Sequence, residues 1–196
     1  MQITINKQKT DIELENEKTL GDVLRAFQKS FEENDAALIG LGIDDLILHP
    51  NDLAAFMEKP LSEISDLNLE TILFSDIQEA LATFTLPLET LSKQFLDIGV
   101  LYQANKDTEA SKIITEFADF FSNLSKTISL LSLFPRYFNE TKINDEMILD
   151  YLNKFSSILI EFENALANND KVLVADLAEY EIAPSLETLS LFCKNN

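Results

Sequence analysis

The sequence predicts an α+β protein in which a small domain of strands and one helix, residues 1–75, precedes an all-α antiparallel bundle of four to five helices, residues 76–196. Two observations favour this class. Apolar residues first alternate with polar ones, which is typical of strands, and from Ser75 onward they recur at helical spacing. Gly (4) and Pro (5) are scarce, so few residues are available for the turns that a many-stranded sheet needs.

The first two strands are predicted from period-2 alternation. Residues 2–6 place Ile3 and Ile5 on one face, and residues 10–15 do the same with Ile12 and Leu14. The polar stretch 7–9 separates them. We therefore expect a hairpin with one face toward the core and one toward water.

A helix is predicted next, beginning after Thr19. Thr19 is a suitable N-cap, and the Asp22 carboxylate three residues later is expected to interact favourably with the free N–H groups of the first turn. The helix is expected to end near residues 33–35. Its apolar residues recur at helical spacing, and they are Leu20, Val23, Leu24, Phe27 and Phe31.

The rest of the small domain reads as short elements. The apolar run 36–43 predicts a buried strand, turned by the solvated pair Asp44 and Asp45, and residues 46–48 predict a short strand that stops at His49. Residues 51 and 52 are expected to cap a short helical turn through residue 57. A tight turn over 60–64 then leads into a last strand over 69–74.

This order of elements resembles the β-grasp, or ubiquitin-like, fold. Residues 59–74 carry the closest similarity, because they resemble the stretch in which a Leu-Ser-Asp-type turn leads into the last strand. Members that act as modifiers or sulfur carriers end in an exposed Gly-Gly, whereas this chain continues from Phe74 into helix. The resemblance therefore implies a recognition module and no conjugation or sulfur-transfer chemistry.

The second half predicts helices over about 76–84, 87–105, 108–134, 144–167 and 170–192. Pro87 suits a first helical turn, Pro135 ends the third helix, and a loop is expected over 136–142. Pro184 lies inside the last helix and is expected to kink it, because its ring removes one helical hydrogen bond.

The last helix carries the candidate partner-binding residues. Asp176, Glu179 and Tyr180 are spaced to share one side of the helix, with Glu181 beside them. They are expected either to bind basic groups or a metal, or to form a polar network that fixes the kinked helix against its neighbour. The apolar face of this helix is expected in the core, and it comprises Val172, Leu173, Leu177, Tyr180 and Pro184. This stretch resembles a motif in helical domains of uncharacterised bacterial proteins, some of which are associated with motility genes.

No residues are predicted to be catalytic, to bind a cofactor or to bind a metal. The single histidine, His49, has no neighbouring nucleophile motif and no Glu-x-x-His partner, and no glycine-rich phosphate loop is present. The single cysteine, Cys193, lies on an apolar helical stripe and is expected to be a small buried residue.

The net charge of −19 includes no basic patch, which argues against nucleic acid and anionic membranes as partners. The acidity is expected either to maintain solubility or to attract a basic protein partner. One cysteine, no signal peptide and no apolar run of about 20 residues together indicate a cytoplasmic protein.

The leading hypothesis is a non-enzymatic adaptor or chaperone-like factor that acts through protein contacts, with a possible place in bacterial secretion or motility. One alternative is a structural subunit that self-associates through the helical bundle. Another is an enzyme with a carboxylate site between the domains. The sequence leaves the oligomeric state open.

Overall fold

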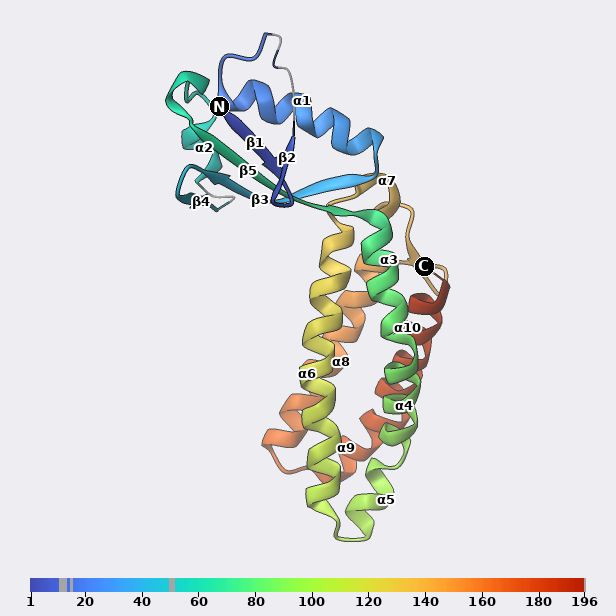
Figure 1. Cartoon of the computed structure of the whole chain (residues 1–196). Helices are drawn as coiled ribbons and strands as arrows, with labels where there is room; N and C mark the ends of the chain where they lie inside the picture. Colours follow the sequence, from blue (N-terminus) through green and yellow to red (C-terminus); the bar gives the residue numbers. More distant parts are fainter. Residues whose placement is uncertain (11–13, 15, 50–51, 196) are drawn as a thin grey trace. The chain divides into compact units, whose positions relative to one another are not determined.

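The structure of the chain is a computed structural model that describes residues 1–10, 14, 16–49 and 52–195 (Figure 1). These residues form two compact units, Met1–Asp76 and Ile77–Asn196. The first unit contains a mixed five-stranded sheet with a helix, and the second is mostly helical. The predicted α+β class is therefore confirmed.

The sheet of the first unit has the strand order β2-β1-β5-β3-β4. β1 and β5 are parallel neighbours, and the other pairs are antiparallel. The helix α1 lies on one face of this sheet (Figure 1). The element bounds are β1 Gln2–Ile5, β2 Gln8–Thr10, α1 Leu20–Glu33, β3 Ala36–Ile43, β4 Leu46–Leu48, α2 Leu53–Phe56, η1 Leu61–Glu63 and β5 Asp66–Leu73.

The first hairpin turns two residues earlier than expected. Asn6 and Lys7 have φ values of 50° and 66°, so a two-residue turn of left-handed residues joins β1 to β2. Asn is one of the residues that such a turn prefers. The second strand therefore begins at Gln8 rather than at residue 10, and the predicted inward residue Ile12 lies outside the described residues.

The predicted start of α1 is confirmed, and it is a capping box. The Thr19 hydroxyl accepts a hydrogen bond from the Asp22 N–H at 3.3 Å, while the Asp22 carboxylate accepts from the N–H groups of Thr19 at 3.0 Å and Lys18 at 3.1 Å. The second residue after the cap, Gly21, lies too close to Met57 for a side chain. Its N–H donates to the Met57 carbonyl at 2.8 Å, and a Cβ on it would come within 2.9 Å of that oxygen.

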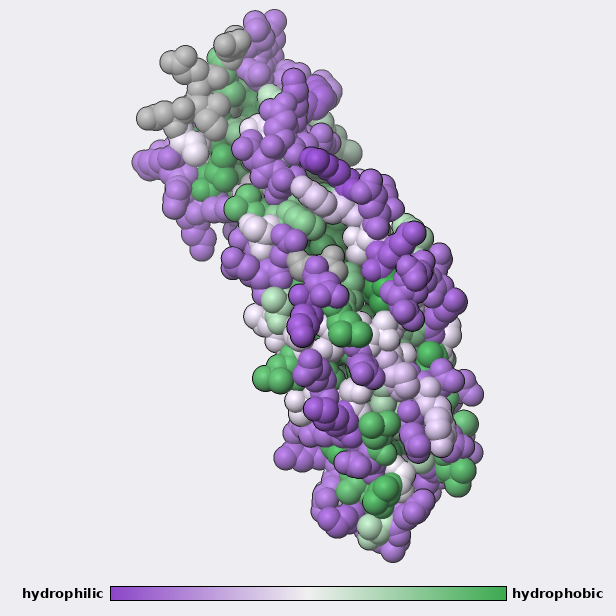
Figure 2. Space-filling view, turned by 90° about the vertical axis from the view of Figure 1, so that its right-hand side faces the viewer, coloured by the Kyte–Doolittle hydropathy of each residue, from purple (hydrophilic) through white to green (hydrophobic). Residues whose placement is uncertain are grey.

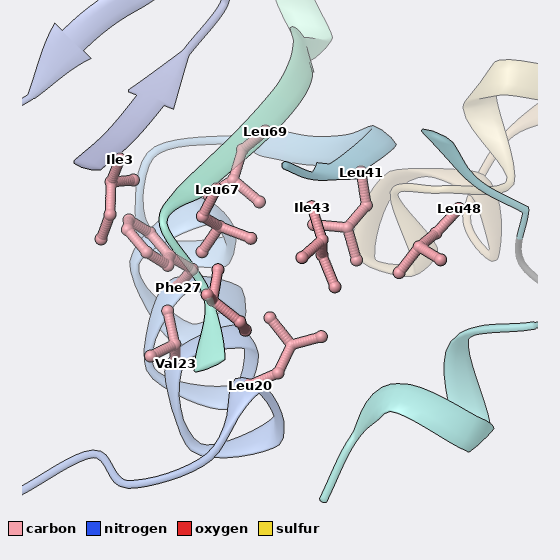
Figure 3. Close-up of a cluster of buried hydrophobic side chains, with 10 residues drawn as sticks. Ile3, Leu20, Val23, Phe27, Leu41, Ile43, Leu48, Leu67 and Leu69 are labelled. Carbon is pink, nitrogen blue, oxygen red and sulfur yellow. The ribbon is translucent and has the colours of Figure 1, made fainter. Parts of the chain in front are cut away.

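The core of the first unit lies between α1 and the sheet. Side chains from α1, from four strands and from the turn before β5 meet there, as Figure 3 shows for nine of them. The inward faces of β3 and β5 alternate with outward ones, as the period-2 pattern predicts. The buried members are Ile3, Leu20, Val23, Phe27, Leu41, Ile43, Leu48, Ile64, Leu67 and Leu69.

The sequence suggested that Asp44 is simply a solvated turn residue, but its side chain binds backbone groups of another segment. It has a φ of 51°, and its Oδ1 accepts hydrogen bonds from the N–H groups of Ser65 and Asp66, each at 2.9 Å. These two bonds lower the pKa of the Asp44 carboxyl. Through them the β3–β4 turn is fixed to the start of β5, which therefore begins at Asp66, three residues before the prediction. Asp52, expected to cap α2, makes no side-chain capping bond.

The second unit consists mainly of helices, as predicted. Their bounds are α3 Phe74–Thr83, α4 Thr85–Leu96, α5 Ile98–Gln103, α6 Asp107–Leu131, α7 Pro135–Phe138, α8 Ile148–Ala167, α9 Lys171–Leu177, the π-helical segment η2 Ala178–Ile182, and α10 Ala183–Asn195. The predicted helix over 87–105 is divided at Asp97, and α6 ends at Leu131, before Pro135.

A small hairpin stands where a loop and a helix start were predicted. β6 (Lys142–Ile143) pairs with β7 (Glu146–Met147) through a turn of Asn144 and Asp145, whose φ values are 53° and 66°. Residue 144 therefore does not begin a helix, and α8 starts at Ile148. Helical periodicity did not reveal this, because two-residue strands are too short to show alternation.

Phenylalanine side chains fill much of the interior of the helical unit. The Phe95 ring lies 4.9 Å from that of Phe117 and 6.0 Å from that of Phe162, and the Phe121 and Phe155 rings are 5.3 Å apart (centroid distances). Phe95, Phe117, Phe155 and Phe162 are buried.

Two buried serines join α4 to α10, which lie side by side (Figure 1). Ser92 Oγ donates to the Ala183 carbonyl at 2.9 Å, and Ser190 Oγ donates to the Thr85 carbonyl at 3.1 Å. Because the later residue of one helix meets the earlier residue of the other, the two helices are antiparallel. Small residues at both contacts also let the backbones approach closely.

We expect Ser92→Ala to lower the free energy of unfolding of the chain by about 1 kcal/mol, because it leaves the buried Ala183 carbonyl without its hydroxyl donor. Urea unfolding followed by circular dichroism measures the change. Ser129→Ala is the matched control, since Ser129 also donates to a helical carbonyl but is exposed, and it should change stability by less than about 0.5 kcal/mol. Equal effects of both variants would contradict the prediction.

The capping box predicts a pH dependence for the first unit. Backbone N–H groups lower the pKa of Asp22 from 3.8 to about 2, so between these values the unfolded chain binds more protons than the folded one. The contribution of Asp22 to stability is therefore complete above about pH 4 and is lost as the pH falls toward 2. The Asp22 carboxyl carbon, followed by NMR during an acid titration, should show the low pKa. Asp22→Asn should remove this part of the pH dependence of unfolding, whereas Glu33→Gln at the other end of α1 should preserve it.

Candidate functional site

The candidate site lies where the last helix is widened before Pro184. Proline has no backbone N–H, so the carbonyl of Tyr180 lacks its usual helical donor. The chain responds with the π-helical segment η2, in which the Ala183 N–H donates to the carbonyl of Ala178, five residues back. The predicted disturbance at Pro184 thus takes the form of a π segment, a feature that is frequent at functional sites.

Hydroxyl groups satisfy the carbonyls around Pro184. Ser185 Oγ donates to the Glu181 carbonyl at 2.7 Å, Ser92 Oγ of α4 to the Ala183 carbonyl at 2.9 Å, and the Tyr151 hydroxyl of α8 to the Ser185 carbonyl at 3.1 Å. A polar network does hold this helix against its neighbours. It consists of hydroxyls and backbone carbonyls, however, and not of the acids of the last helix.

The predicted apolar face of the last helix is largely wrong. Of its five residues only Leu177 is buried, while Val172 is 72% and Tyr180 is 65% exposed. The π segment adds one residue to the turn and so shifts the helical phase after Leu177, which a regular 3.6-residue count cannot anticipate. This shift bears on Tyr180 and Pro184, whereas Val172 precedes the segment and is exposed because of how α9 packs. The side chains that enter the core are Val174, Leu177, Ala178, Ile182, Ala183 and Leu186.

The four predicted partner-binding residues are all exposed. We call Asp176, Glu179, Tyr180 and Glu181 the π-segment surface. The neighbouring Glu179 carboxylate raises the pKa of the Tyr180 phenol, first as a hydrogen-bond acceptor and then by its charge, and Asp176 adds a smaller effect. The structure therefore brings Asp176, Glu179 and Tyr180 together. Glu181 is the residue after Tyr180 in the same π segment.

The charge of this stretch is of one sign. Between Lys171 and Lys194 the chain has four acids and no base. Lys171 itself is engaged, because its Nζ lies 2.6 Å from the Asp107 carboxylate and 5.4 Å from the centre of the Tyr102 ring. An exposed aromatic ring beside carboxylates can bind an ammonium or guanidinium group by charge and by contact with the ring face.

Val172, which was predicted to lie in the core, is exposed instead. It is exposed one helical turn before Asp176, and so adds an apolar side chain beside the π-segment surface. The charge pattern gave no signal of this, because Val172 fits a buried stripe as well as an exposed one. Only the packing of α9 distinguishes the two.

Other reactive side chains lie elsewhere in the chain. His49 is exposed in the first unit, and Cys193 is buried in α10, where burial raises the pKa of its thiol to about 12. In the part of the chain that the structure describes, no three His, Cys, Asp or Glu residues are grouped so as to hold a metal ion. No described helix has the length and apolar character needed to cross a membrane.

These observations define a two-unit α+β protein whose helical unit presents an acidic, aromatic surface. The family model described as "TP0873 N-terminal domain" matches residues 1–73, and the model "Domain of unknown function (DUF8042)" matches residues 79–191. The second match covers more than half of the chain, which therefore belongs to the DUF8042 family.

One relative is a protein of Treponema pallidum (strain Nichols) described as "Uncharacterized protein". It is 25% identical over 190 residues, which cover 97% of this chain and 94% of the relative. No solved structure matches the chain. The predicted similarity to uncharacterised bacterial proteins is confirmed at this level, while the association with motility is untested.

We expect Glu179→Gln to lower the pKa of Tyr180 toward 10.0, since it removes the largest cause of the raised value. The Tyr180 ring-carbon NMR signal, followed during an alkaline titration, measures this pKa separately from those of the other tyrosines. Asp176→Asn should lower it less. A larger effect from Asp176→Asn would contradict the prediction that Glu179 raises the pKa of Tyr180 more than Asp176 does.

Proposed function

We propose that the chain is a non-enzymatic protein-binding adaptor or chaperone-like factor, and that its π-segment surface binds a basic segment of a partner protein. The observation that carries this proposal is the exposed Tyr180 among Asp176, Glu179 and Glu181, in a stretch without any basic residue. Burying cationic groups of a partner against these side chains would neutralise charges that have no counter-ion in their own helix.

The π segment supports a rigid surface at this position. Hydroxyls of Ser92, Tyr151 and Ser185 bind carbonyls on either side of Pro184, so the widened turn is held by contacts with α4 and α8. A surface that is ordered before binding loses less conformational entropy when a partner docks. Exposed Val172 offers an apolar contact as well, which favours a partner segment with both basic and apolar side chains.

The first unit is proposed to be a β-grasp module. Its strand order β2-β1-β5-β3-β4, with parallel β1 and β5 and a helix between β2 and β3, is the order of the ubiquitin-like fold. The chain continues from β5 into α3 without a Gly-Gly end, so this proposal is confined to recognition. For the second unit, the antiparallel pairing of α4 and α10 supports the finer proposal of an antiparallel bundle.

The proposed compartment is the cytoplasm, which suits a single buried thiol and a strongly acidic chain. A role in secretion or motility stays a prediction. A catalytic role is not part of the proposal. Cysteine and histidine often serve as nucleophile and base in enzymes, but the single cysteine, Cys193, and the single histidine, His49, belong to different units.

A self-associating structural subunit is the second candidate. Apolar side chains are exposed on several helices of the second unit, and Figure 2 shows green side chains among polar ones on one face of it. They include Leu86, Val100, Leu149, Ile160 and Leu191. Size-exclusion chromatography with light scattering distinguishes this candidate, because it requires a stable oligomer, whereas the adaptor is expected to be a monomer without its partner.

To test the leading proposal, the full chain is immobilised and used to capture proteins from an extract of its native cells, which are identified by mass spectrometry. The variant Asp176→Asn/Glu179→Gln/Glu181→Gln should capture at least tenfold less of a basic protein that the wild type binds. The matched control is Asp150→Asn/Glu161→Gln/Glu163→Gln, which removes three exposed acids from α8 with the same change in net charge.

The proposal is supported when the same protein binds the wild type and the α8 control, is lost with the π-segment variant, and dissociates as salt is raised. Equal loss with both triple variants would show a nonspecific effect of net charge and overturn the assignment to this surface. A stable homo-oligomer with no captured protein would favour the structural subunit instead.

A further inference from the structure

The two edges of the sheet in the first unit differ in character. The edge strand β2 has an exposed lysine, Lys9, and exposed Lys7 lies in the turn before it; charged residues of this kind discourage further strand pairing. The opposite edge strand, β4, contains only apolar residues, and two of them are exposed, Leu46 at 50% and Ile47 at 76%. β4 thus lacks the protection that β2 has.

The backbone of Ile47 is available for pairing. β4 pairs with β3 through Ile43–Leu46, Gly42–Ile47 and Leu41–Leu48, and a two-residue turn closes the hairpin at Ile43 and Leu46. Opposite residues in an antiparallel pair alternate between hydrogen-bonded and non-hydrogen-bonded positions, and the pair that closes the turn is the bonded one. The N–H and C=O of Ile47 therefore point away from β3. Within the described residues, no turn or cap outside the sheet bonds them.

The side chain of Ile47 is uncovered because its neighbour across the sheet is a glycine. Ile47 lies opposite Gly42, on the face that does not carry the core residues Leu41, Ile43 and Leu48. The Gly40 position on that face lies against Glu70, since a Cβ there would come within 2.8 Å of Glu70 Oε2. The outer face next to β4 therefore offers one large apolar side chain, two glycines, the amide of Asn68 opposite Gly42 and the carboxylate of Glu70.

The edge is also held in place before any partner binds. Asp44, in the turn that precedes β4, binds the N–H groups of Ser65 and Asp66 through its side chain. On the other side of the turn, Leu48 is buried in the core. The exposed residues Leu46 and Ile47 lie between these two fixed points.

We propose that the β4 edge binds an extended, basic segment of a partner protein, which adds as a sixth strand next to Ile47. A free strand edge is matched by a backbone in the extended conformation, since only that conformation presents its donors and acceptors at the required spacing. The charge selects the segment. The first unit has 16 acidic and 6 basic residues, a net charge of −10, and Asp44 and Asp45 directly precede β4, with Glu70 on the far side of β3.

The same charge argues against a second copy of the chain as the occupant. Each copy has a net charge of −19, so pairing two β4 edges would bring like charges together. This proposal does not depend on the π-segment surface, because the two surfaces belong to different units and can be altered separately.

The test uses the full chain and two synthetic peptides of ten residues, one alternating valine with lysine and one alternating valine with glutamate. Two-dimensional NMR measures the amide shifts of the chain during titration with each peptide. The lysine peptide should shift the amides of Leu46, Ile47 and Leu48 in a saturable manner and slow hydrogen exchange at Ile47. The glutamate peptide should bind at least tenfold more weakly.

The decisive variant is Ile47→Pro, which removes only an outward N–H and therefore keeps the β3–β4 pairing. Lys9→Pro is its matched control, because the Thr4–Lys9 pair occupies the equivalent position next to the two-residue turn on the other edge. Thermal unfolding establishes that both variants are folded. As a second variant, Ile47→Thr keeps the strand backbone and removes the apolar contact, and should weaken binding by a smaller factor.

Ile47→Pro should weaken binding of the lysine peptide at least tenfold, while Lys9→Pro preserves it. Equal effects of the two proline variants, or equal binding of the two peptides, would overturn the proposal. Concentration-dependent dimerisation of the free chain that Ile47→Pro abolishes would also overturn it, by identifying a second copy as the occupant. Because Asp176, Glu179 and Glu181 are unchanged here, failure at β4 leaves the proposed function of the π-segment surface standing.

Discussion

The missing N–H of Pro184 is the constraint on which the arrangement of the last helix depends. In a regular helix the carbonyl of Tyr180 would have no N–H donor at Pro184, and at this point the turn widens into the π segment, where the Ala183 N–H donates to the Ala178 carbonyl. The widening shifts the phase of the helix after Leu177, so Tyr180 faces solvent while Ala178, Ile182 and Ala183 enter the core. The surface that we propose for binding thus arises from a backbone requirement.

Hydroxyl side chains stabilise this irregular turn within a packed interior by donating hydrogen bonds to backbone carbonyls. Ser92 and Ser190 exchange hydrogen bonds between α4 and α10 across a buried contact, and Tyr151 reaches from α8 to the carbonyl of Ser185. In the described residues, no buried side-chain nitrogen or oxygen is left without a partner. Satisfied polar groups of this kind fix one arrangement of the helices, because any slip would leave a buried carbonyl unpaired.

The first unit depends on a comparable use of side chains to hold backbone. Asp22 binds the N–H groups of Lys18 and Thr19 at the start of α1, and Asp44 binds those of Ser65 and Asp66 at the start of β5. Both carboxylates stay ionised more readily for that reason, and their pKa values are lowered. Part of the large negative charge therefore serves to hold the backbone of the first unit. Among the hydrogen bonds described, the Asp176 and Glu179 carboxylates bind neither a base nor a backbone N–H. This leaves them available to the partner that we propose.

The sequence by itself determined the α+β class, the order of the first-unit elements, the cap at Thr19 and the exposed acids of the last helix, since each depends on local spacing or on charge. Tertiary structure decided the rest. The left-handed turns at Asn6–Lys7 and Asn144–Asp145 moved strand and helix starts, because two residues carry little pattern. The burial of Leu177 but not Val172, and the exposure of Ile47 opposite Gly42, follow from packing and register. The packing of α9 joins residues distant along the chain, and the exposure of Ile47 depends on which face of the sheet carries the core, so no local count reveals either.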